Sequence, residues 1–306
     1  MSTVVNKEYI NEQRLEMDTS LSEIKNQYKK EKRSKFIQRC LSNKTLMISS
    51  STLLFIFIIM LITPFITKYD PLTSNVIDRM KGPSMDHLFG TDRLGRDVFS
   101  RVLYGTRISL LVGTTVGIMS GLIGCVIGLY SAYYRKLDNI LMRFMDGIMS
   151  IPEILLAIIL MASLGPSTLN VLISLSVVFI PTVARTIRSA ALSVKEQPYI
   201  EALKSIGASS KRIIWCHILP NCLSSLLVQT AYVFSFAIII ESSLSFLGVG
   251  TPPPTPSWGA ILQEGAVVID VGWWMTVFPG AAILLTIVSS NLLSDGIRDF
   301  IDQHSR

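Results

Sequence analysis

Charged side chains are scarce in this 306-residue chain, and so are histidine and cysteine. Charged residues make up 16% of the sequence, hydrophobic residues make up 49%, and the mean hydropathy is positive. This balance is unusual for a soluble protein of such length and indicates a membrane protein. The four cysteines form no CxxC pair, so neither a disulfide framework nor a zinc site is indicated.

Motifs of catalysis are also missing from the sequence. There is no HExxH or GxSxG, and the three histidines lie far apart. Gly90 and Gly95 have the glycine spacing of a phosphate-binding loop, but Arg96 and Asp97 stand where lysine and serine or threonine are required. We therefore expect no catalytic residue, no ATP site, no metal site and no cofactor in this chain.

Apolar residues are grouped into six segments that carry almost no charge. Each segment is near or above the length of about 17–20 residues that a helix needs to cross roughly 30 Å of hydrocarbon. Open strands cannot substitute, because lipid leaves their backbone groups unpaired. We expect an all-α membrane protein with six transmembrane helices, at residues 46–66, 108–134, 147–164, 167–184, 218–240 and 271–294.

These segments divide the chain into five parts. The expected parts are a tail, a first transmembrane helix, an extracytoplasmic segment, a core with five transmembrane helices and a loop at 195–220, and a second tail, at residues 1–45, 46–67, 68–105, 106–299 and 300–306.

Lysine and arginine predict the orientation of the spans. Residues 1–45 carry ten of them, the 185–217 loop carries six, and the 248–270 loop carries none. Positive charge marks the cytoplasmic side, so both termini and the 185–217 loop are expected there. The 68–107 segment then lies outside despite seven basic residues, which are offset by Asp70, Asp78, Asp86, Asp92 and Asp97.

The basic stretch between the fourth and fifth spans has the signals of a helix, a turn and a second helix. Pro198 suits the first turn of a helix, and no other helix breaker precedes Gly207, which can take the positive φ that ends it. Ser209 or Ser210 can cap a second helix, and Pro220 is expected to mark where that helix gives way to the next span.

The same stretch resembles the EAA motif by which permease subunits of ABC importers bind their ATPase. Leu203 departs from it where a second alanine is usual, and His217 stands where isoleucine is often found. The resemblance implies an ATPase-coupling role for Glu201, Ala202, Gly207, Ala208, Leu219 and Pro220.

Three further stretches resemble the oligopeptide and dipeptide permeases of the C type. They are GTDRLGRDVFSR at 90–101, PPTPSWG at 253–259 and NLLSDGIRD at 291–299. In the first, Asp92, Arg93, Arg96 and Asp97 can pair with each other in a compact plug. That plug is either a self-contained folded loop or a contact for a solute-binding protein or a partner permease.

The resemblance implies a MetI-like ABC permease fold and a set of partners. These are a second homologous permease, two cytoplasmic ATPase subunits that bind ATP and Mg, an extracytoplasmic solute-binding protein, a di- or oligopeptide substrate and membrane lipid, without nucleic acid. It also implies a bacterial cytoplasmic membrane location and transport by alternating access. Nickel and metallophore importers share these motifs and stay an alternative. A channel or an ion-driven carrier would need inverted repeats or paired intramembrane charges, which we do not find.

Two acidic residues fall within the apolar segments. Glu153 follows Pro152, so that a carboxylate and a proline kink coincide, and Glu241 lies near three serines that could donate to it. Intramembrane acids face a cavity or a partner in most cases, so each has either a structural role or a place in the pathway or gate. Trp273 and Trp274 are expected in an interfacial aromatic belt.

Overall fold

The computed structural model describes residues 44–302, so the expectations for the tail at 1–43 and for residues 303–306 lie outside the described residues. Residues 48 onward form one compact unit, and the first described residues, 44–47, belong to another. All the elements of the described part are helical, which confirms the all-α prediction. In chain order they are α2 (Lys44–Ile66), η1 (Val76–Asp78), α3 (Val98–Tyr133), α4 (Arg135–Met149), α5 (Glu153–Leu164), α6 (Thr168–Lys195), α7 (Pro198–Ser205), α8 (Ser210–Arg212), η2 (Ile213–Ile218), α9 (Leu219–Phe246), α10 (Trp258–Ala266) and α11 (Trp274–Asp302).

Within residues 44–302, five helices are long and apolar enough to cross a membrane. They are α2, α3, α6, α9 with its preceding turns, and α11. A sixth span exists only if α4 and α5 count as one, because these two helices meet at 90°. The last helix also continues to Asp302, past the predicted start of the tail at residue 300.

The third predicted span is broken rather than kinked. α4 ends at Met149 and α5 begins at Glu153, directly after Pro152. Proline has no N–H and its ring clashes with the preceding turn, so a helix cannot run through this position undisturbed. α5 is almost entirely apolar after Glu153, whereas α4 is amphipathic, with charged side chains along one face.

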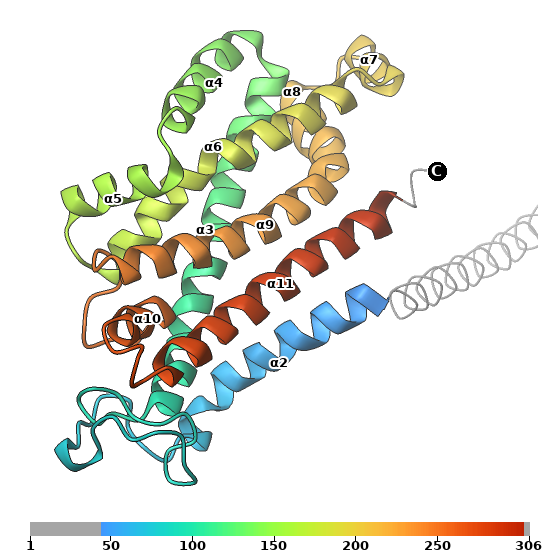
Figure 1. Ribbon diagram of the computed structural model, residues 1–306. Coiled ribbons are helices and arrows are strands. Elements are labelled where there is room, and N and C mark those ends of the chain that lie inside the picture. The colour runs from blue at the N-terminus through green and yellow to red at the C-terminus, as the bar shows by residue number, and fades with distance from the viewer. Residues whose placement is uncertain (1–43, 303–306) are drawn as a thin grey trace, which may run out of the picture. The chain divides into compact units, whose positions relative to one another are not determined.

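Helix α3 lies at the centre of the unit and begins ten residues earlier than predicted. The Asp97 carboxylate caps it by accepting a hydrogen bond from the backbone N–H of Ser100 at 2.8 Å. Residues 98–105, predicted to be extracytoplasmic, are therefore part of this helix. α3 packs mainly against α6 and α9 (Figure 1).

Close packing at the centre depends on small residues of α3. A Cβ atom added at Gly128 would lie 2.6 Å from the backbone oxygen of Ala184, and one added at Gly124 would lie 2.7 Å from Val183 Cβ. Larger residues would push α3 and α6 apart, as at other membrane helix contacts built on small residues. The apolar core that results includes Leu129, Leu175, Phe179 and Ile187.

Two ends of the bundle can be distinguished in Figure 1. The α2–α3 connection, residues 67–97, lies beside α10 and the start of α11, which we call the connection end. Helices α7 and α8 lie at the other end, which we call the α7 end. There are two predicted sites, the coupling segment and the pair of acidic residues. They lie at different distances from these two ends.

Candidate functional site

Helix α7 and the turn after it follow the sequence signals closely. Pro198 occupies the first helical position, and Gly207 has φ +80°, in the left-handed region that glycine adopts without strain. The backbone N–H of Ala208 donates to the carbonyl of Leu203 at 3.0 Å, and the N–H of Gly207 donates to Lys204 at 3.0 Å. This bond pair is the Schellman ending of a helix. The predicted glycine turn is confirmed.

The second helix begins as predicted but does not end where expected. The Ser209 hydroxyl accepts from the N–H of Arg212 and caps α8. From Ser210 the chain then runs on through the π-helical turn η2 into α9 as one helix to Phe246. Pro220 lies in the first turn of α9, where a missing N–H is tolerated in a helix start. The prediction that Pro220 separates this helix from the fifth span is wrong.

One face of the helix pair holds it to the bundle. Ile200, Ile213 and Ile214 are fully buried in the main apolar core, and Leu203 and Ala208 pack against that core. α7 packs against η2, which in turn packs against α3, α6 and α9. The pair is therefore attached to the bundle through η2.

The opposite face of the helix pair is open. Glu201, Ala202 and Gly207 are exposed, and the Ile206 side chain is 79% exposed. A Cβ atom added at Gly207 would meet nothing within 4 Å. Of the other coupling candidates, Ala208 and Leu219 are half-buried and Pro220 is exposed. This face of the pair is therefore uncovered within residues 44–302.

Glu201 makes no ion pair with another residue in the 44–302 range. Lys211 and Arg212, which the sequence offered as partners, are exposed on α8 and do not bridge to it. Its charge is therefore open to a partner.

Glu153 is the first residue of α5 and its side chain is exposed. The carboxylate lies within electrostatic reach of the Tyr232 hydroxyl on α9. Tyr232 stacks on Phe236 with ring centroids 4.3 Å apart. The sequence identified this carboxylate, but not its electrostatic interaction with Tyr232, 79 positions further along the chain.

Glu241 has the opposite environment, because it is fully buried near the end of α9. Its Oε1 accepts hydrogen bonds from the Ser245 hydroxyl at 2.7 Å and the Thr251 hydroxyl at 3.3 Å. Among the described residues, its Oε2 has no hydrogen-bond partner. Of the three serines that the sequence suggested, Ser245 donates to it, whereas the Ser243 hydroxyl donates to the carbonyl of Ile239.

Tight backbone packing surrounds Glu241. A Cβ atom added at Gly250 would lie 2.2 Å from the Ser245 hydroxyl, and one added at Gly259 would lie 2.4 Å from the carbonyl of Ser242. The two glycines bring the loop after α9, and then α10, directly against α9. Through Thr251, Glu241 fastens the loop after α9 to the end of the fifth span at the connection end.

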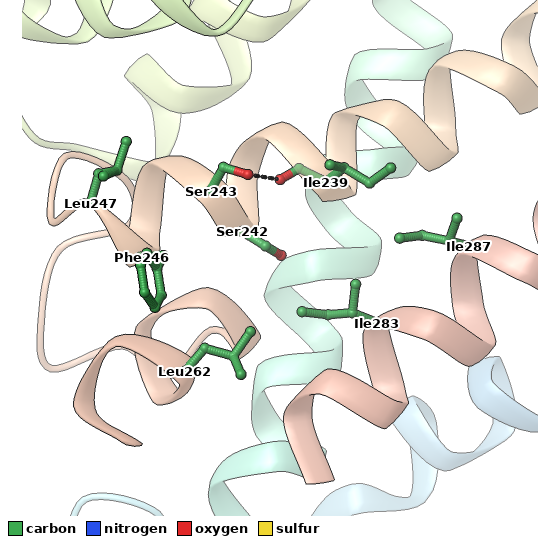
Figure 2. Close-up of a pocket in the computed structure, with 8 residues that line it drawn as sticks. All are labelled: Ile239, Ser242, Ser243, Phe246, Leu247, Leu262, Ile283 and Ile287. Atoms are coloured by element: carbon green, nitrogen blue, oxygen red, sulfur yellow. Dashed lines mark hydrogen bonds between the residues drawn. The ribbon is translucent and has the colours of Figure 1, made fainter. Parts of the chain in front are cut away.

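An apolar pocket of about 460 Å³ lies beside this junction, between α9, α10 and α11 (Figure 2). Its walls are Ile239, Ser242, Ser243, Phe246, Leu247, Leu262, Ile283 and Ile287. Figure 2 shows aliphatic and aromatic side chains on all sides, with the two serines on the α9 wall. No charged group lines it, so it is separate from the two acidic sites.

A buried charge cluster ties the 67–97 connection to α10. Asp92, which is fully buried, accepts from Arg96 Nε and Arg101 Nη1, both at 2.6 Å. Glu264 of α10 accepts from Arg96 Nη2 at 2.7 Å and from Arg101 Nη2 at 2.8 Å. The sequence predicted pairing among the residues of the plug, and the Asp92–Arg96 pair confirms it in part. Arg101 and Glu264 were not predicted as members of this cluster, because no motif near either residue in the sequence links it to the other.

Asp97 and Arg93 do not join this cluster. Asp97 contacts the ring of His87, with Oδ1 2.9 Å from Nδ1, and caps α3, while Arg93 is exposed. In the same connection, a hydrogen bond from Lys81 holds the pKa of Asp78 below its usual range.

The prediction that Trp274 belongs to an interfacial aromatic belt is wrong. Its side chain is buried, and its Nε1–H donates to the carbonyl of Thr91 at 3.0 Å. A Cβ atom at Gly90 would lie 2.8 Å from that Nε1 atom, so glycine makes room for the indole. Trp273 is half exposed, as a belt residue would be.

Comparison with known families gives two matches. The model of the binding-protein-dependent transport system inner membrane component family matches residues 114–306. The model of the N-terminal TM domain of oligopeptide transport permease C matches residues 34–83. These matches confirm the resemblance that the sequence motifs indicated.

Two named relatives align over most of the chain. A Brucella abortus protein, provisionally named a peptide transport system permease protein, is 44% identical over 87% of this chain and 90% of its own length. The dipeptide transport system permease protein DppC of Bacillus subtilis is 37% identical over 88% of this chain and 85% of its own length.

A solved structure shares the fold. The MetNI methionine ABC transporter, in an inward-facing conformation, contains a chain that matches with a TM-score of 0.53 and 18% identity. The match covers 64% of this chain and 96% of that one. The expected MetI-like fold is confirmed.

Proposed function

Since the chain belongs to the family of binding-protein-dependent transport system inner membrane components, we propose that it forms half of the membrane pathway of an ATP-driven importer of di- and oligopeptides. It is a multi-pass membrane protein. The names of its relatives refer to peptide and dipeptide transport, and these favour peptides over metal chelates as the substrate class.

The single observation that carries the proposal is the helix pair α7–α8. Its inner face is fixed to the main core, and its outer face presents Glu201, Ala202 and Ile206 next to the glycine turn. We assign to this face the contact with the ATPase subunits. Those subunits, and not this chain, bind ATP and Mg. Closure of two ATPases would move the pair as a lever and turn the cavity between two permeases from one side to the other.

The two acids take different parts in this mechanism. Glu241 holds the loop after α9 against the span through Thr251, and so acts as a structural element of the gate at the connection end. Glu153, which is exposed on α5, lines the pathway. The α7 end faces the cytoplasm, in keeping with the basic residues of the 185–217 loop. The connection end then meets the solute-binding protein.

Uptake in a strain that lacks only this gene tests the proposal. Labelled di- and oligopeptides are compared with labelled nickel, with and without a chelating carrier, in one strain. Loss of peptide uptake that the gene restores, and that its Gly207→Asp form does not restore, is expected. Loss of nickel uptake alone would move the substrate to a metal chelate, and no loss of either would overturn the proposal.

A further inference from the structure

The break between α4 and α5 places charged groups inside the membrane thickness. α5 has 12 residues, so at 1.5 Å per residue it is about 18 Å long, against about 30 Å of hydrocarbon. Its last residue, Leu164, lies next to Thr168, where α6 starts towards the α7 end. Glu153, at the other end of α5, is therefore within the hydrocarbon depth and not at its surface.

Positions along two neighbouring helices can be compared with this depth. Tyr232 is about 21 Å along α9 from its end at Phe246. Arg185 is about 26 Å along α6 from Thr168, and it pairs with Asp146 of α4 at 2.5 Å. The Arg185–Asp146 pair therefore lies further towards the α7 end than Glu153, where the 185–217 loop begins.

These groups cannot face lipid. The side chains of Arg185 and Asp146 are 54% and 60% exposed, and Glu153 is also exposed. An exposed charge at this depth is expensive in hydrocarbon, and such residues face water-filled cavities or partners. The face formed by α4, α5 and this part of α6 and α9 therefore borders an aqueous space, which we call the vestibule.

Two ion pairs lie at the vestibule, and among the described residues several other charges there are unpaired. Asp146 pairs with Arg185, and the Arg188 guanidinium donates two hydrogen bonds to the Asp138 carboxylate, with Nη2 2.6 Å from Oδ2. Within residues 44–302, neither Glu153 nor Arg143 has an ion-pair partner. In this same range Glu153 is the unpaired anion of α5, and Arg143 is one of three unpaired cations of α4, the others being Arg135 and Lys136 in its first turn.

A pocket lies at the bend, with Arg143 in its wall. It has a volume of about 610 Å³, within the range of small-ligand sites. Arg143 and Asn139 line its α4 side, and Leu156 lines its α5 side. The rest of the wall is apolar: Ile140, Phe144, Ile148 and Ile151, with Gly147. Glu153 is outside the lining and lies one helical turn before Leu156 on α5.

We propose that Glu153 binds the N-terminal ammonium group of a peptide in transit and that Arg143 binds its C-terminal carboxylate, with an apolar side chain in the pocket at the bend. The site rests on the proposed function and adds a recognition step inside the permease. Both contacts are charge-assisted, and the guanidinium of Arg143 suits a carboxylate.

Cysteine protection tests the site on the purified complex, without transport. The four native cysteines are replaced by alanine, Leu156→Cys is introduced, and its rate of labelling by a maleimide is measured with increasing concentrations of an apolar tripeptide. We expect the tripeptide to slow labelling. The N-acetyl and C-amide forms of the same peptide are expected to protect about tenfold less well, the ratio that corresponds to one lost contact of about 1.4 kcal/mol.

Two variants give a crossed result that a structural role does not produce. Glu153→Gln is expected to make the free and N-acetyl peptides equal while the C-amide form stays weaker. Arg143→Gln is expected to make the free and C-amide peptides equal while the N-acetyl form stays weaker. Glu153→Asp should keep the original order, and Asp270→Asn, an exposed acid outside this pocket, should change nothing.

The outcomes separate this inference from the proposed function. If the gene restores peptide uptake but the tripeptide does not protect, or all three peptide forms protect equally in the unmodified background, the recognition site is wrong and the permease function stands. If peptide uptake is not restored and protection is also absent, both are wrong.

Discussion

Arg101 and Glu264, 163 positions apart in the sequence, form a two-bond ion pair that joins the first turn of α3 to α10. The Arg101 side chain is 3% exposed and also binds Asp92, which is fully buried. Desolvated charges of this kind are stable only when every partner is in place. The pair therefore makes α3, α10 and the 67–97 connection one rigid block.

Glu264→Gln is expected to destabilise this block. The substitution removes the charge that offsets Arg96 and Arg101, and Asp92 is left as their shared carboxylate. Loss of hydrogen bonds to a charged group costs about 1–3 kcal/mol. Thermal unfolding of the purified protein in detergent should show a lower midpoint, and Arg93→Gln, at an exposed position of the same connection, should not. An unchanged midpoint would mean that the cluster contributes no stability.

Trp274→Phe is expected to loosen the 67–97 connection from α11. Phenylalanine fills much of the indole space but cannot donate to the Thr91 carbonyl, which then stays buried without this partner. An unsatisfied buried acceptor costs about 1–3 kcal/mol. Hydrogen exchange around Thr91 should become faster, whereas Trp273→Phe, at a half-exposed ring, should leave it unchanged. Equal exchange in both variants would count against the anchoring role of Trp274.

Signals that lie within a few residues were sufficient to predict the local structure around α7. Pro198, Gly207 and Ser209 each act on the backbone within one turn, so their effects can be read without a partner. Pro220 was misread because a proline in the first turn of a helix and one after a helix end look alike in sequence. The π-helical turn before Pro220 continues the helix into α9, and this turn has no sequence signal that we recognise.

Contacts between distant segments could not be predicted in the same way. No motif around Glu264 indicates that it pairs with Arg101. From the sequence, Trp274 cannot be distinguished from an ordinary tryptophan at a membrane boundary, because its contact with Gly90 is visible only in the structure. Glu153 was singled out because an acid in an apolar segment is expensive. Its neighbour Tyr232 and the depth at which it lies follow only from the 90° break between α4 and α5.

Gly207 offers a test of coupling that separates backbone strain from surface charge. Its Cβ position is open, so substitutions act through the positive φ and through the exposed face. Asparagine adopts this conformation more readily than most residues and is neutral, aspartate adds a charge, and valine is strongly disfavoured there. We expect peptide uptake to fall in the order Asn, Asp, Val, with ATP hydrolysis no longer stimulated by substrate in the last two.

Binding of the purified ATPase to each Gly207 variant is the matching measurement. Thermal unfolding of the asparagine and aspartate variants should be nearly unchanged, because a Cβ atom at this site meets nothing within 4 Å, whereas the positive φ should make the valine variant less stable. Loss of ATPase binding by the aspartate variant, with its fold intact, supports docking at the turn. If the valine variant binds the ATPase and transports like the parent protein, the coupling assignment of this turn is wrong.

The structural role of Glu241 in the gate can be tested by substitutions that remove or keep its hydrogen-bond acceptor. Glu241→Ala removes the acceptor of the Ser245 and Thr251 hydroxyls, and each buried hydroxyl without a partner costs about 1–3 kcal/mol. Glu241→Gln keeps an acceptor oxygen of the same reach. We therefore expect the alanine variant to lose most of its transport and the glutamine variant to keep a larger share.

Crosslinking reports directly on that gate. Val249 lies in the loop after α9, which Glu241 fastens through Thr251. Cysteines placed in this loop and on α9 should therefore crosslink less in the alanine variant than in the parent. A drop in transport with unchanged crosslinking would assign Glu241 to substrate contact instead. Equal transport in the parent, alanine and glutamine forms would remove it from the gate, because a junction that opens and closes with the transport cycle cannot lose its buried acceptor without a change in rate.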